Sequence, residues 1–457
     1  MAVHRTSGSS ARLRHVGPAP APGSRRRQKG RLVGAAAAAA LVAVACSSTK
    51  SASSSTTAAP AASAAPGSTA AAGPSNTVGV TDTTVTIGGI YAAAAYPGAP
   101  LGVQAAINDV NTSGGINGRK VVLSEMIDDG LDPNKDLAAA KRLVEVDHVF
   151  AVVPSETFVF TGSAKYLASV QTPAFGRGDD LGFCDNDYTF AYIGCSFPVS
   201  KNINNYGPSF DKAVPGGIKG KAIAFIGIDN DSAKVGQAGF ASVLKNDGMN
   251  VVASISTIPT PPAVVGDYSP YVSQLLSSNG GKQPDVIMGS LPSTNEAPLV
   301  AALNNAGYKG VYIGFSSYNS KVAAAVKGAY MIYQLAPIEQ NTSAVQQMLA
   351  SIKAVNTNNE TVDDSVVQAY WDAKIFIEGL RKTGKNLTKQ AFMNTMNTSF
   401  DYNVPGGLGE VKWPEFHTGG RTCNAILQST GTAFRVAVPF MCVPNVPNPN
   451  PQPLPSQ

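Results

Sequence analysis

Histidine, tryptophan and charged residues are scarce in this sequence. Its 457 residues include four histidines and two tryptophans, and Asp, Glu, Lys and Arg together make up 14%. His4 and His15 lie in the N-terminal leader, which leaves His148 and His417 for catalysis or metal binding. The G-x-S-x-G, H-E-x-x-H and P-loop motifs are also missing. These absences argue against the common hydrolases, zinc proteases and nucleotide-binding enzymes, so we expect no catalysis, no cofactor and no metal site.

The positive charge of the sequence is confined to its N-terminus. The formal net charge is +5, but eight of the 35 Lys and Arg residues lie among the first 31 positions, where no acid occurs. The other 27 face 30 acids, and nothing further along forms the basic stripe that phosphate binding needs. Nucleic acid is therefore not an expected partner.

Long apolar runs are missing as well. No segment has the ~20 consecutive apolar residues that a transmembrane helix needs. The charge-free run 32–45 follows a cluster of arginines and ends at Cys46, which is the plan of a secretory signal peptide. Ala43-Val44-Ala45-Cys46 resembles the bacterial lipobox, with alanine in place of the usual leucine three residues before the cysteine. We predict a signal peptide over 1–45 and a lipid on Cys46. The alternative is an ordinary signal peptide that ends near a chance cysteine.

The segment 46–80 is rich in Ser, Ala, Thr and Pro. Such sequence is typical of a flexible tether that holds a globular domain clear of a surface. We expect an exported protein, anchored by lipid to the outer face of the bacterial cytoplasmic membrane without spanning it. The Pro- and Asn-rich end, 444–457, is predicted to be a disordered tail.

Four cysteines remain once Cys46 is set aside, and an even number in an exported chain predicts disulfides. The pairs Cys184–Cys195 and Cys423–Cys442 are favoured, because each brackets a short segment. Two apolar runs around a Ser/Thr/Gly turn between the second pair indicate a hairpin. A zinc site of four thiolates is the alternative, but the close C-x-x-C spacing is absent.

Beyond the tether, apolar strand patterns alternate with helical patterns, which indicates an α/β fold. The first half predicts strands at 85–90, 121–126, 149–153 and 172–175, and helices at 99–110, from Asp132-Pro133 onwards, and at 163–170. The pattern then starts again, with strands at 221–228, 251–256, 285–288 and 311–313 and helices at 236–247, 268–278 and 297–306. Two similar stacks in series predict two doubly wound lobes.

Two further helices are expected late in the chain, at 343–356 and 365–381. Their apolar residues recur at helical spacing and need a face to cover, which the first lobe can supply. We therefore predict that lobe 1 comprises residues 81–197 plus 335–418. Lobe 2 then comprises 198–334 plus 419–443.

Several short motifs follow one another in a recognisable order. They are VTIG at 85–88, AAIN at 105–108, GGINGRK at 114–120, DD at 128–129, DP at 132–133, KRLV at 141–144 and YWDA at 370–373. Together they resemble the periplasmic-binding-protein family of the leucine, isoleucine and valine type, the substrate-binding component of branched-chain amino acid ABC transporters. The resemblance covers about Thr81 to Val443.

The resemblance implies a type I periplasmic-binding-protein fold, in which three crossing strands form a hinge between the two lobes. A small molecule is expected in the cleft between them, at strand carboxyl ends and helix N-termini. The ligand closes the lobes, and the closed form is what a membrane permease of the ABC type recognises. The implied protein is a monomer with a small-molecule ligand and a permease as its partners.

The resemblance also assigns ligand contacts in the first lobe. Thr157 is expected to hold a ligand carboxylate, while Gly178 and Asp179 contact the polar head, with Asp179 paired to an ammonium group. Tyr96 is expected to cover an apolar side chain. For each position the alternative is an ordinary surface loop or turn.

In the second lobe the sequence departs from the family pattern. The glutamate that grips the ligand's ammonium is replaced by Ser316, and an aromatic position near the start of a helix is closest to Ser293. A tyrosine expected before Gly236 is Val235, where 229–234 looks like an insertion. A serine does not neutralise a desolvated ammonium as a carboxylate does.

The ligand therefore need not be a branched-chain amino acid. Other amino acids, amides, urea-like molecules and small carboxylic acids all suit a pocket that relies on hydroxyl groups. The leading interpretation is a solute-binding protein of an ABC importer. The alternative is a ligand-sensing module for a signalling partner, which also performs no catalysis.

Overall fold

The computed structural model describes residues 76–197, 199, 202–448, 451 and 453. The predicted signal peptide, the lipid site at Cys46 and most of the predicted tether lie outside the described residues. Within them, no helix combines the length and the apolar character needed to cross a membrane.

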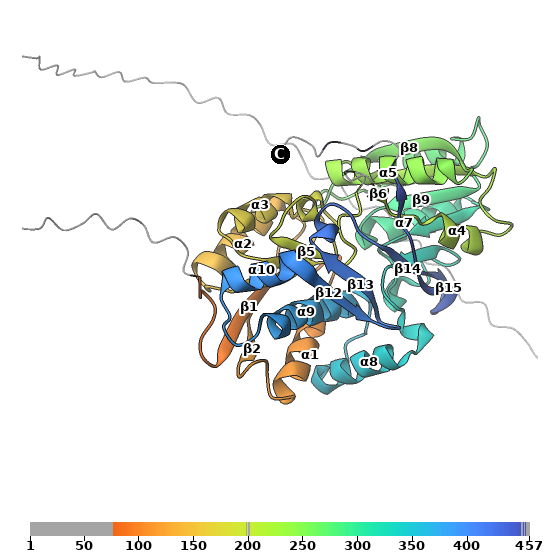
Figure 1. Ribbon diagram of the computed structural model, residues 1–457. Coiled ribbons are helices and arrows are strands. Elements are labelled where there is room, and N and C mark those ends of the chain that lie inside the picture. The colour runs from red at the N-terminus through yellow and green to blue at the C-terminus, as the bar shows by residue number, and fades with distance from the viewer. Residues whose placement is uncertain (1–75, 198, 200–201, 449–450, 452, 454–457) are drawn as a thin grey trace, which may run out of the picture. The chain divides into compact units, whose positions relative to one another are not determined.

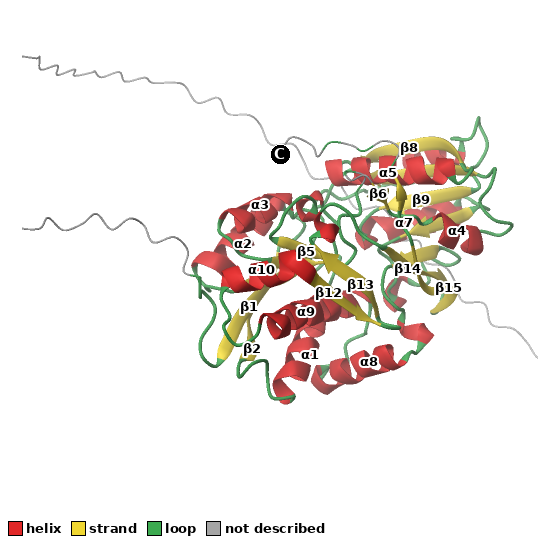
Figure 2. Cartoon of the chain, in the orientation of Figure 1, coloured by secondary structure: helices red, strands yellow, loops and turns green. Residues whose placement is uncertain are grey.

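Five parallel strands form the first sheet, in the order β2-β1-β3-β4-β5. They are β1 (Thr84–Tyr91), β2 (Lys120–Asp128), β3 (Ala151–Glu156), β4 (Ala174–Gly176) and β5 (Thr189–Ala191). The helices α1 (Ala99–Thr112), α2 (Pro133–Glu145) and α3 (Thr161–Ser169) alternate with them (Figure 2). As predicted, α2 starts at Asp132-Pro133, where the Asp132 side chain accepts a hydrogen bond from the backbone N–H of Asn134.

The second sheet repeats the strand order of the first. Strands β8-β7-β9-β10-β11 are parallel, and β14 and β15 add two antiparallel strands beside β11. Their bounds are β7 (Ala222–Ile228), β8 (Asn250–Ile258), β9 (Val286–Ser290), β10 (Val311–Gly314), β11 (Tyr330–Tyr333), β14 (Thr422–Ser429) and β15 (Phe434–Val443). The helices of this lobe are α4 (Gly207–Ala213), α5 (Asp231–Asn246), α6 (Ser269–Leu276) and α7 (Ser293–Asn305). The expectation of two doubly wound stacks is confirmed.

Three helices from late in the chain return to the first sheet. They are α8 (Ser343–Val355), α9 (Asp364–Thr383) and α10 (Lys389–Ser399), followed by the hairpin β12 (Phe400–Val404) and β13 (Leu408–Trp413). Helix α9 packs against α1, α10 and the strands β3 and β4, which brings the blue and orange segments of Figure 1 together. Its Phe376 ring meets Phe150, Phe175 and Phe392 at centroid distances of 5.5–6.2 Å. The chain thus passes between the two sheets three times.

Both predicted disulfides are present. Cys184 is bonded to Cys195, and Cys423 to Cys442. The second bond joins residues that face each other on β14 and β15, as the hairpin interpretation requires. The zinc alternative for these four cysteines is wrong, because all four sulfurs are used in disulfides.

The structure corrects three boundaries. The prediction of a disordered tail from 444 is wrong for Val446–Pro447, which form β16 and pair with β6 (Asn202–Ile203). The Asn445 side chain holds this segment by bonding to Thr422 and to the carbonyl of Gly420. The last residues of the predicted tether are also ordered.

In that tether end, the Asn76 carbonyl and side chain accept hydrogen bonds from the backbone N–H groups of Lys389 and Gln390. The third correction concerns the start of the helix predicted at 236–247. Asn230 caps α5 by accepting from the backbone N–H of Ala233, so the helix begins five residues before the predicted 236.

Candidate functional site

A pocket lies where the carboxyl ends of strands from both sheets meet. First-lobe lining residues follow β3, β4 and β5, and second-lobe lining residues follow β7, β9, β10 and β11. The lining comprises Phe158, Arg177, Gly178, Asp179, Ile193, Ser196, Phe197, Tyr206, Ile228, Asn230, Ser232, Ala233, Gly236, Phe240, Ser290, Leu291, Pro292, Phe315, Ser316 and Gln334. Open α/β sheets place their ligands at this position.

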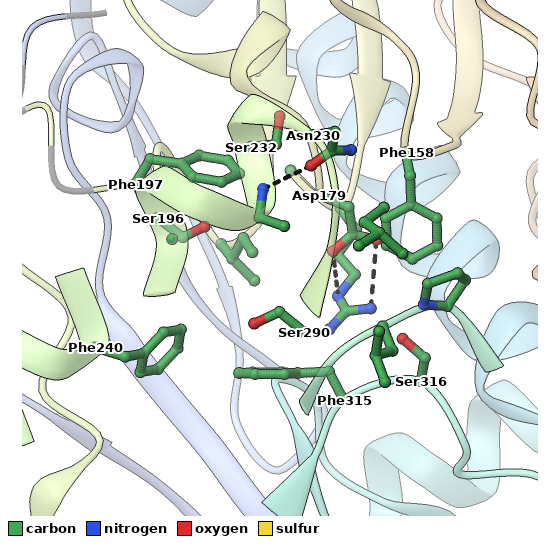
Figure 3. Close-up of a pocket in the computed structure, with 18 of the residues that line it drawn as sticks. Phe158, Asp179, Ser196, Phe197, Asn230, Ser232, Phe240, Ser290, Phe315 and Ser316 are labelled. Atoms are coloured by element: carbon green, nitrogen blue, oxygen red, sulfur yellow. Dashed lines mark hydrogen bonds and ion pairs between the residues drawn. The ribbon is translucent and has the colours of Figure 1, made fainter. Parts of the chain in front are cut away.

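The wall of the pocket is largely apolar and includes several aromatic rings. Phe158, Phe197, Phe240 and Phe315 approach it from different sides (Figure 3). Phe240 lies 5.5 Å from the Phe315 ring and 5.2 Å from Tyr206, measured between centroids. Rings in this arrangement suit a flat apolar body, because they offer large contact areas at little cost in side-chain entropy.

One cation, Arg177, lines the pocket and is only 3% exposed. Its Nε lies 3.2 Å from Oδ1 of Asp179, Nη1 donates to Oδ2 of the same residue at 3.3 Å, and Nη2 donates to Oε1 of Gln334 at 2.9 Å. The Tyr96 hydroxyl also donates to Oδ2 of Asp179. The carboxylate of Asp179 is thus neutralised by its own neighbours. The guanidinium group of Arg177 has five N–H donors, and its partners Asp179 and Gln334 do not use all of them.

The six predicted contact residues do not all reach the pocket. Gly178, Asp179 and Ser316 line it. Gly178 has φ +106°, a backbone conformation in which a side chain is strained, so glycine is required there. The other three predicted residues stand behind or beside the lining.

Tyr96 is buried behind Asp179, with its ring 5.5 Å from Phe158. Thr157 precedes Phe158 and is buried, with its hydroxyl accepting from the N–H of Val159. Ser293 is the first residue of α7, just after the lining residue Pro292. A direct ligand contact by these three remains a prediction.

A buried glutamate shapes the second-lobe wall. Glu296 on α7 is fully buried; its Oε1 accepts from the N–H of Phe315 at 3.2 Å, and its Oε2 accepts from the N–H of Ser316 at 3.0 Å. The Tyr312 hydroxyl donates to Oε1 at 3.3 Å. A Cβ at Gly314 would collide with this carboxylate, so glycine makes room for it. Glu296 therefore fixes the turn that presents Phe315 and Ser316.

The two lobes touch beside the pocket. Ser232, near the start of α5, donates to Oδ2 of Asp180 at 3.2 Å and accepts from the N–H of Leu181 at 3.3 Å. Asp180 also accepts from the hydroxyl of Thr161 and the N–H of Gly182. Burial raises the pKa of Asp180, because three hydrogen bonds only partly replace water. This polar contact holds the lobes together in the state observed.

The N-termini of α5 and α7 both border the pocket, through Asn230, Ser232 and Pro292. Helix N-termini carry partial positive charge and favour anions. Phe197 forms another part of the wall and packs with Leu181 against the Cys184–Cys195 disulfide. Val235 lies against the same cluster rather than in the pocket.

The remaining histidines lie away from the pocket. His417 is 3% exposed; its Nε2 bonds to Asn397, and burial lowers its pKa to about 4. His148 ends a turn after α2, with φ +51° and Nδ1 3.3 Å from the carbonyl of Val144. Neither is placed to act on a molecule held between the lobes.

Comparison with known proteins decides the family. The family model described as periplasmic binding protein matches residues 77–432. The chain belongs to this family. Among the curated proteins compared with the sequence, none matches.

Solved periplasmic binding proteins share the fold at low sequence identity. A fatty acid ABC transporter substrate-binding protein from Thermomonospora curvata has a TM-score of 0.63 at 18% identity, with 81% of this chain and 94% of that chain covered. A solute-binding protein from Rhodopseudomonas palustris in complex with p-hydroxybenzoic acid has a TM-score of 0.63 at 15% identity, with 80% and 98% covered. The isoleucine complex of a branched-chain amino acid transporter protein from Streptococcus pneumoniae gives 0.60 at 17%, with 79% and 100% covered.

Sequence reasoning missed the residues that give this pocket its character. Arg177 stands directly before the predicted Gly178, so its place after β4 was a usable signal. No such signal existed for Phe240, which lies well inside α5, or for Gln334, which follows the short strand β11. Glu296 reads from the sequence as a surface residue in the first turn of a helix.

We predict that Glu296→Gln loosens the wall turn. An amide presents one oxygen and one NH₂ group, so one of the N–H groups of Phe315 and Ser316 loses its acceptor, at a cost of about 1–3 kcal/mol. Native-state hydrogen exchange at these two amides should accelerate roughly tenfold or more.

The matched control is Glu339→Gln. Glu339 is a second glutamate that accepts from a tyrosine, Tyr318, but it lies outside the lining of this pocket. It should leave exchange at Phe315 and Ser316 unchanged. Equal exchange rates at these amides in Glu296→Gln and the wild type would contradict a positioning role for Glu296.

Proposed function

We propose that this protein binds a small carboxylic acid with a flat apolar body and delivers it to an ABC permease. The single observation that supports this most strongly is the pocket chemistry: a largely apolar wall with several aromatic rings, one cation, Arg177, and no unpaired carboxylate among its lining residues. The membership of the family and the pocket between two lobes support solute binding without catalysis.

An amino acid is the less suitable ligand, because its ammonium group needs a carboxylate. Asp179 is the one acid among the lining residues, and Arg177 and Tyr96 already occupy it. Ser316 stands where the family resemblance places a glutamate. An ammonium held there would lose its water without gaining a full counter-charge, which costs several kcal/mol.

A carboxylate finds more partners. Arg177 retains free N–H donors, and the N-termini of α5 and α7 add partial positive charge. The phenylalanines then enclose the apolar body. One structural neighbour is in complex with p-hydroxybenzoic acid, and another is a fatty acid ABC transporter substrate-binding protein; both compounds are carboxylic acids.

Lobe closure follows from the same geometry. Lining residues come from both lobes, and Ser232 bonds across to Asp180 at the pocket edge. A ligand that contacts both sides binds the closed arrangement better than an open one, so it shifts the population toward closure. The permease then recognises the closed form. In this proposal lobe 1 spans 81–197 plus 335–418, and lobe 2 spans 198–334 plus 419–443.

The direct test is the melting shift of the soluble protein from residue 76 onwards against amino acids, amides, ureas, sugars and carboxylates. At a hundredfold excess over its Kd, a ligand adds about 2.7 kcal/mol to the free energy of unfolding. We expect an aromatic monocarboxylate such as p-hydroxybenzoate to raise the melting temperature and leucine to leave it unchanged. A shift with leucine alone would overturn the proposed ligand class.

A variant pair locates the binding site. Phe315→Ala removes a ring from the wall and should weaken binding roughly tenfold, in line with about 1.5–3 kcal/mol for a buried phenyl group. Phe434→Ala, which removes a buried ring outside this pocket, is the control and should bind normally. Equal binding by Phe315→Ala and the wild type would place the ligand elsewhere.

We also propose that the protein reaches its permease as a lipoprotein. Family membership implies an extracytoplasmic location, and the leader, Cys46 and the Ser/Ala/Thr/Pro-rich tether supply the signals for export and anchoring. Cys46→Ser should move the protein from the membrane fraction to the soluble fraction of the cells. Retention of the variant on the membrane would rule out a lipid on Cys46 as the anchor.

A further inference from the structure

Two acidic side chains lie buried behind Arg177 without lining the pocket. Glu156 is the last residue of β3 and is 1% exposed, and Asp372 lies in α9 and is fully buried. No donor among the described residues reaches any of their four carboxyl oxygens. Helix α9 packs against β3, and each carboxyl group shifts the pKa of the other. Two buried carboxylates that interact in this way do not both ionise, so the pair shares a proton.

The groups around this pair come from several elements. Arg177 and Asp179 face it from the loop after β4, Tyr96 from the loop after β1, and Tyr192 from the segment after β5. Arg177 is the one cation among them. The Tyr192 hydroxyl has no hydrogen-bond partner among the described residues. Nothing else in this set neutralises a second negative charge.

The pKa values follow from these surroundings. Burial raises the pKa of Asp372 to about 7. Burial and then the charge of Asp372 raise the pKa of Glu156 well above its usual range. Because the two sites interact, the protons leave in two steps that belong to the pair. Near neutral pH the pair therefore stands between one proton and two.

The charges around Arg177 do not compensate a further anion unless a proton binds together with it. Arg177 and Asp179 cancel, and the pair carries one negative charge while it holds a single proton. A ligand carboxylate beside Arg177 adds a second negative charge in a region with little water, where charges interact strongly. A second proton on the pair removes that repulsion.

We infer that the Glu156–Asp372 pair is a proton-binding site coupled to the pocket, which takes up a proton when an anionic ligand binds beside Arg177. This inference rests on the proposed binding of a carboxylate. It makes capture of the ligand depend on pH, although neither acid touches the ligand. The affinity for a carboxylate should rise roughly fivefold to tenfold between pH 8 and pH 6, while that for a neutral solute stays constant.

The test is calorimetric titration with p-hydroxybenzoate at pH 7 in two buffers of different ionisation enthalpy. The wild type should show a buffer-dependent heat that corresponds to proton uptake. Asp372→Asn places an amide donor against Glu156 and removes one titrating group, so the uptake and the pH dependence of affinity should disappear. Asp109→Asn is the control, because Asp109 pairs with Lys374 near the surface and lies outside this cluster. It should behave as the wild type does.

A measurement without ligand checks the pair itself. Folded-state pKa values above the unfolded values give stability that is present at low pH and is lost as pH rises through about 7. The melting temperature of the wild type should therefore fall more steeply from pH 6 to pH 8 than that of Asp372→Asn. If Asp372→Asn does not fold, Glu156→Gln serves in its place. If neither variant folds, the buffer dependence of the binding heat of the wild type alone decides whether binding takes up a proton.

The outcomes separate the two claims. Binding of p-hydroxybenzoate with a heat that does not depend on the buffer would overturn the coupling and leave the proposed ligand class standing. Binding of leucine or of neutral solutes alone, with no monocarboxylic acid such as p-hydroxybenzoate bound, would overturn both. Proton uptake that persists unchanged in Asp372→Asn would overturn the assignment to this pair.

Discussion

The buried charge of Arg177 is the constraint on which the pocket depends. A guanidinium group that is 3% exposed needs partners, and the chain supplies Asp179 two residues further on and Gln334 directly after β11 of the second sheet. Losing one partner of a buried pair costs several kcal/mol. The hydrogen bond from Arg177 to Gln334 therefore ties the loop after β4 to the chain that leaves β11, at the place where the two lobes meet.

The same constraint decides what the pocket accepts. Because Asp179 is occupied by Arg177 and Tyr96, the lining offers N–H donors of Arg177 and no free carboxylate, and the phenylalanines supply the contact area. Glu296 does not line the pocket, but it accepts hydrogen bonds from the N–H groups of the lining residues Phe315 and Ser316. Glu156 and Asp372 act behind the cation, where their shared proton sets the local charge. The specificity of the site thus resides in residues that support the lining as much as in the lining itself.

Local sequence signals predicted the fold well, whereas the site needed contacts between distant residues. Asp132-Pro133 marked a helix start, and the apolar periodicity of α9 indicated a helix with a face to bury, because these signals act within a few residues. The prediction of a disordered tail was wrong because Asn445 bonds to Thr422 and Gly420, which are distant in the sequence, and no local pattern indicates such a contact. The meeting of Glu156 with Asp372, more than 200 positions apart, and of Phe240 with Phe315 likewise depends on packing. Gly178 and Asp179, which line the pocket, were predicted from the family resemblance, which places ligand contacts in the loop after a predicted strand.

The measurement that tests the account most directly is a crystal structure of the protein grown with p-hydroxybenzoate. The account predicts the carboxylate within hydrogen-bonding distance of Arg177 and the ring among Phe158, Phe240 and Phe315, with both lobes in contact. A ligand bound outside this pocket would contradict it. A bound carboxylate turned away from Arg177 would contradict it as well.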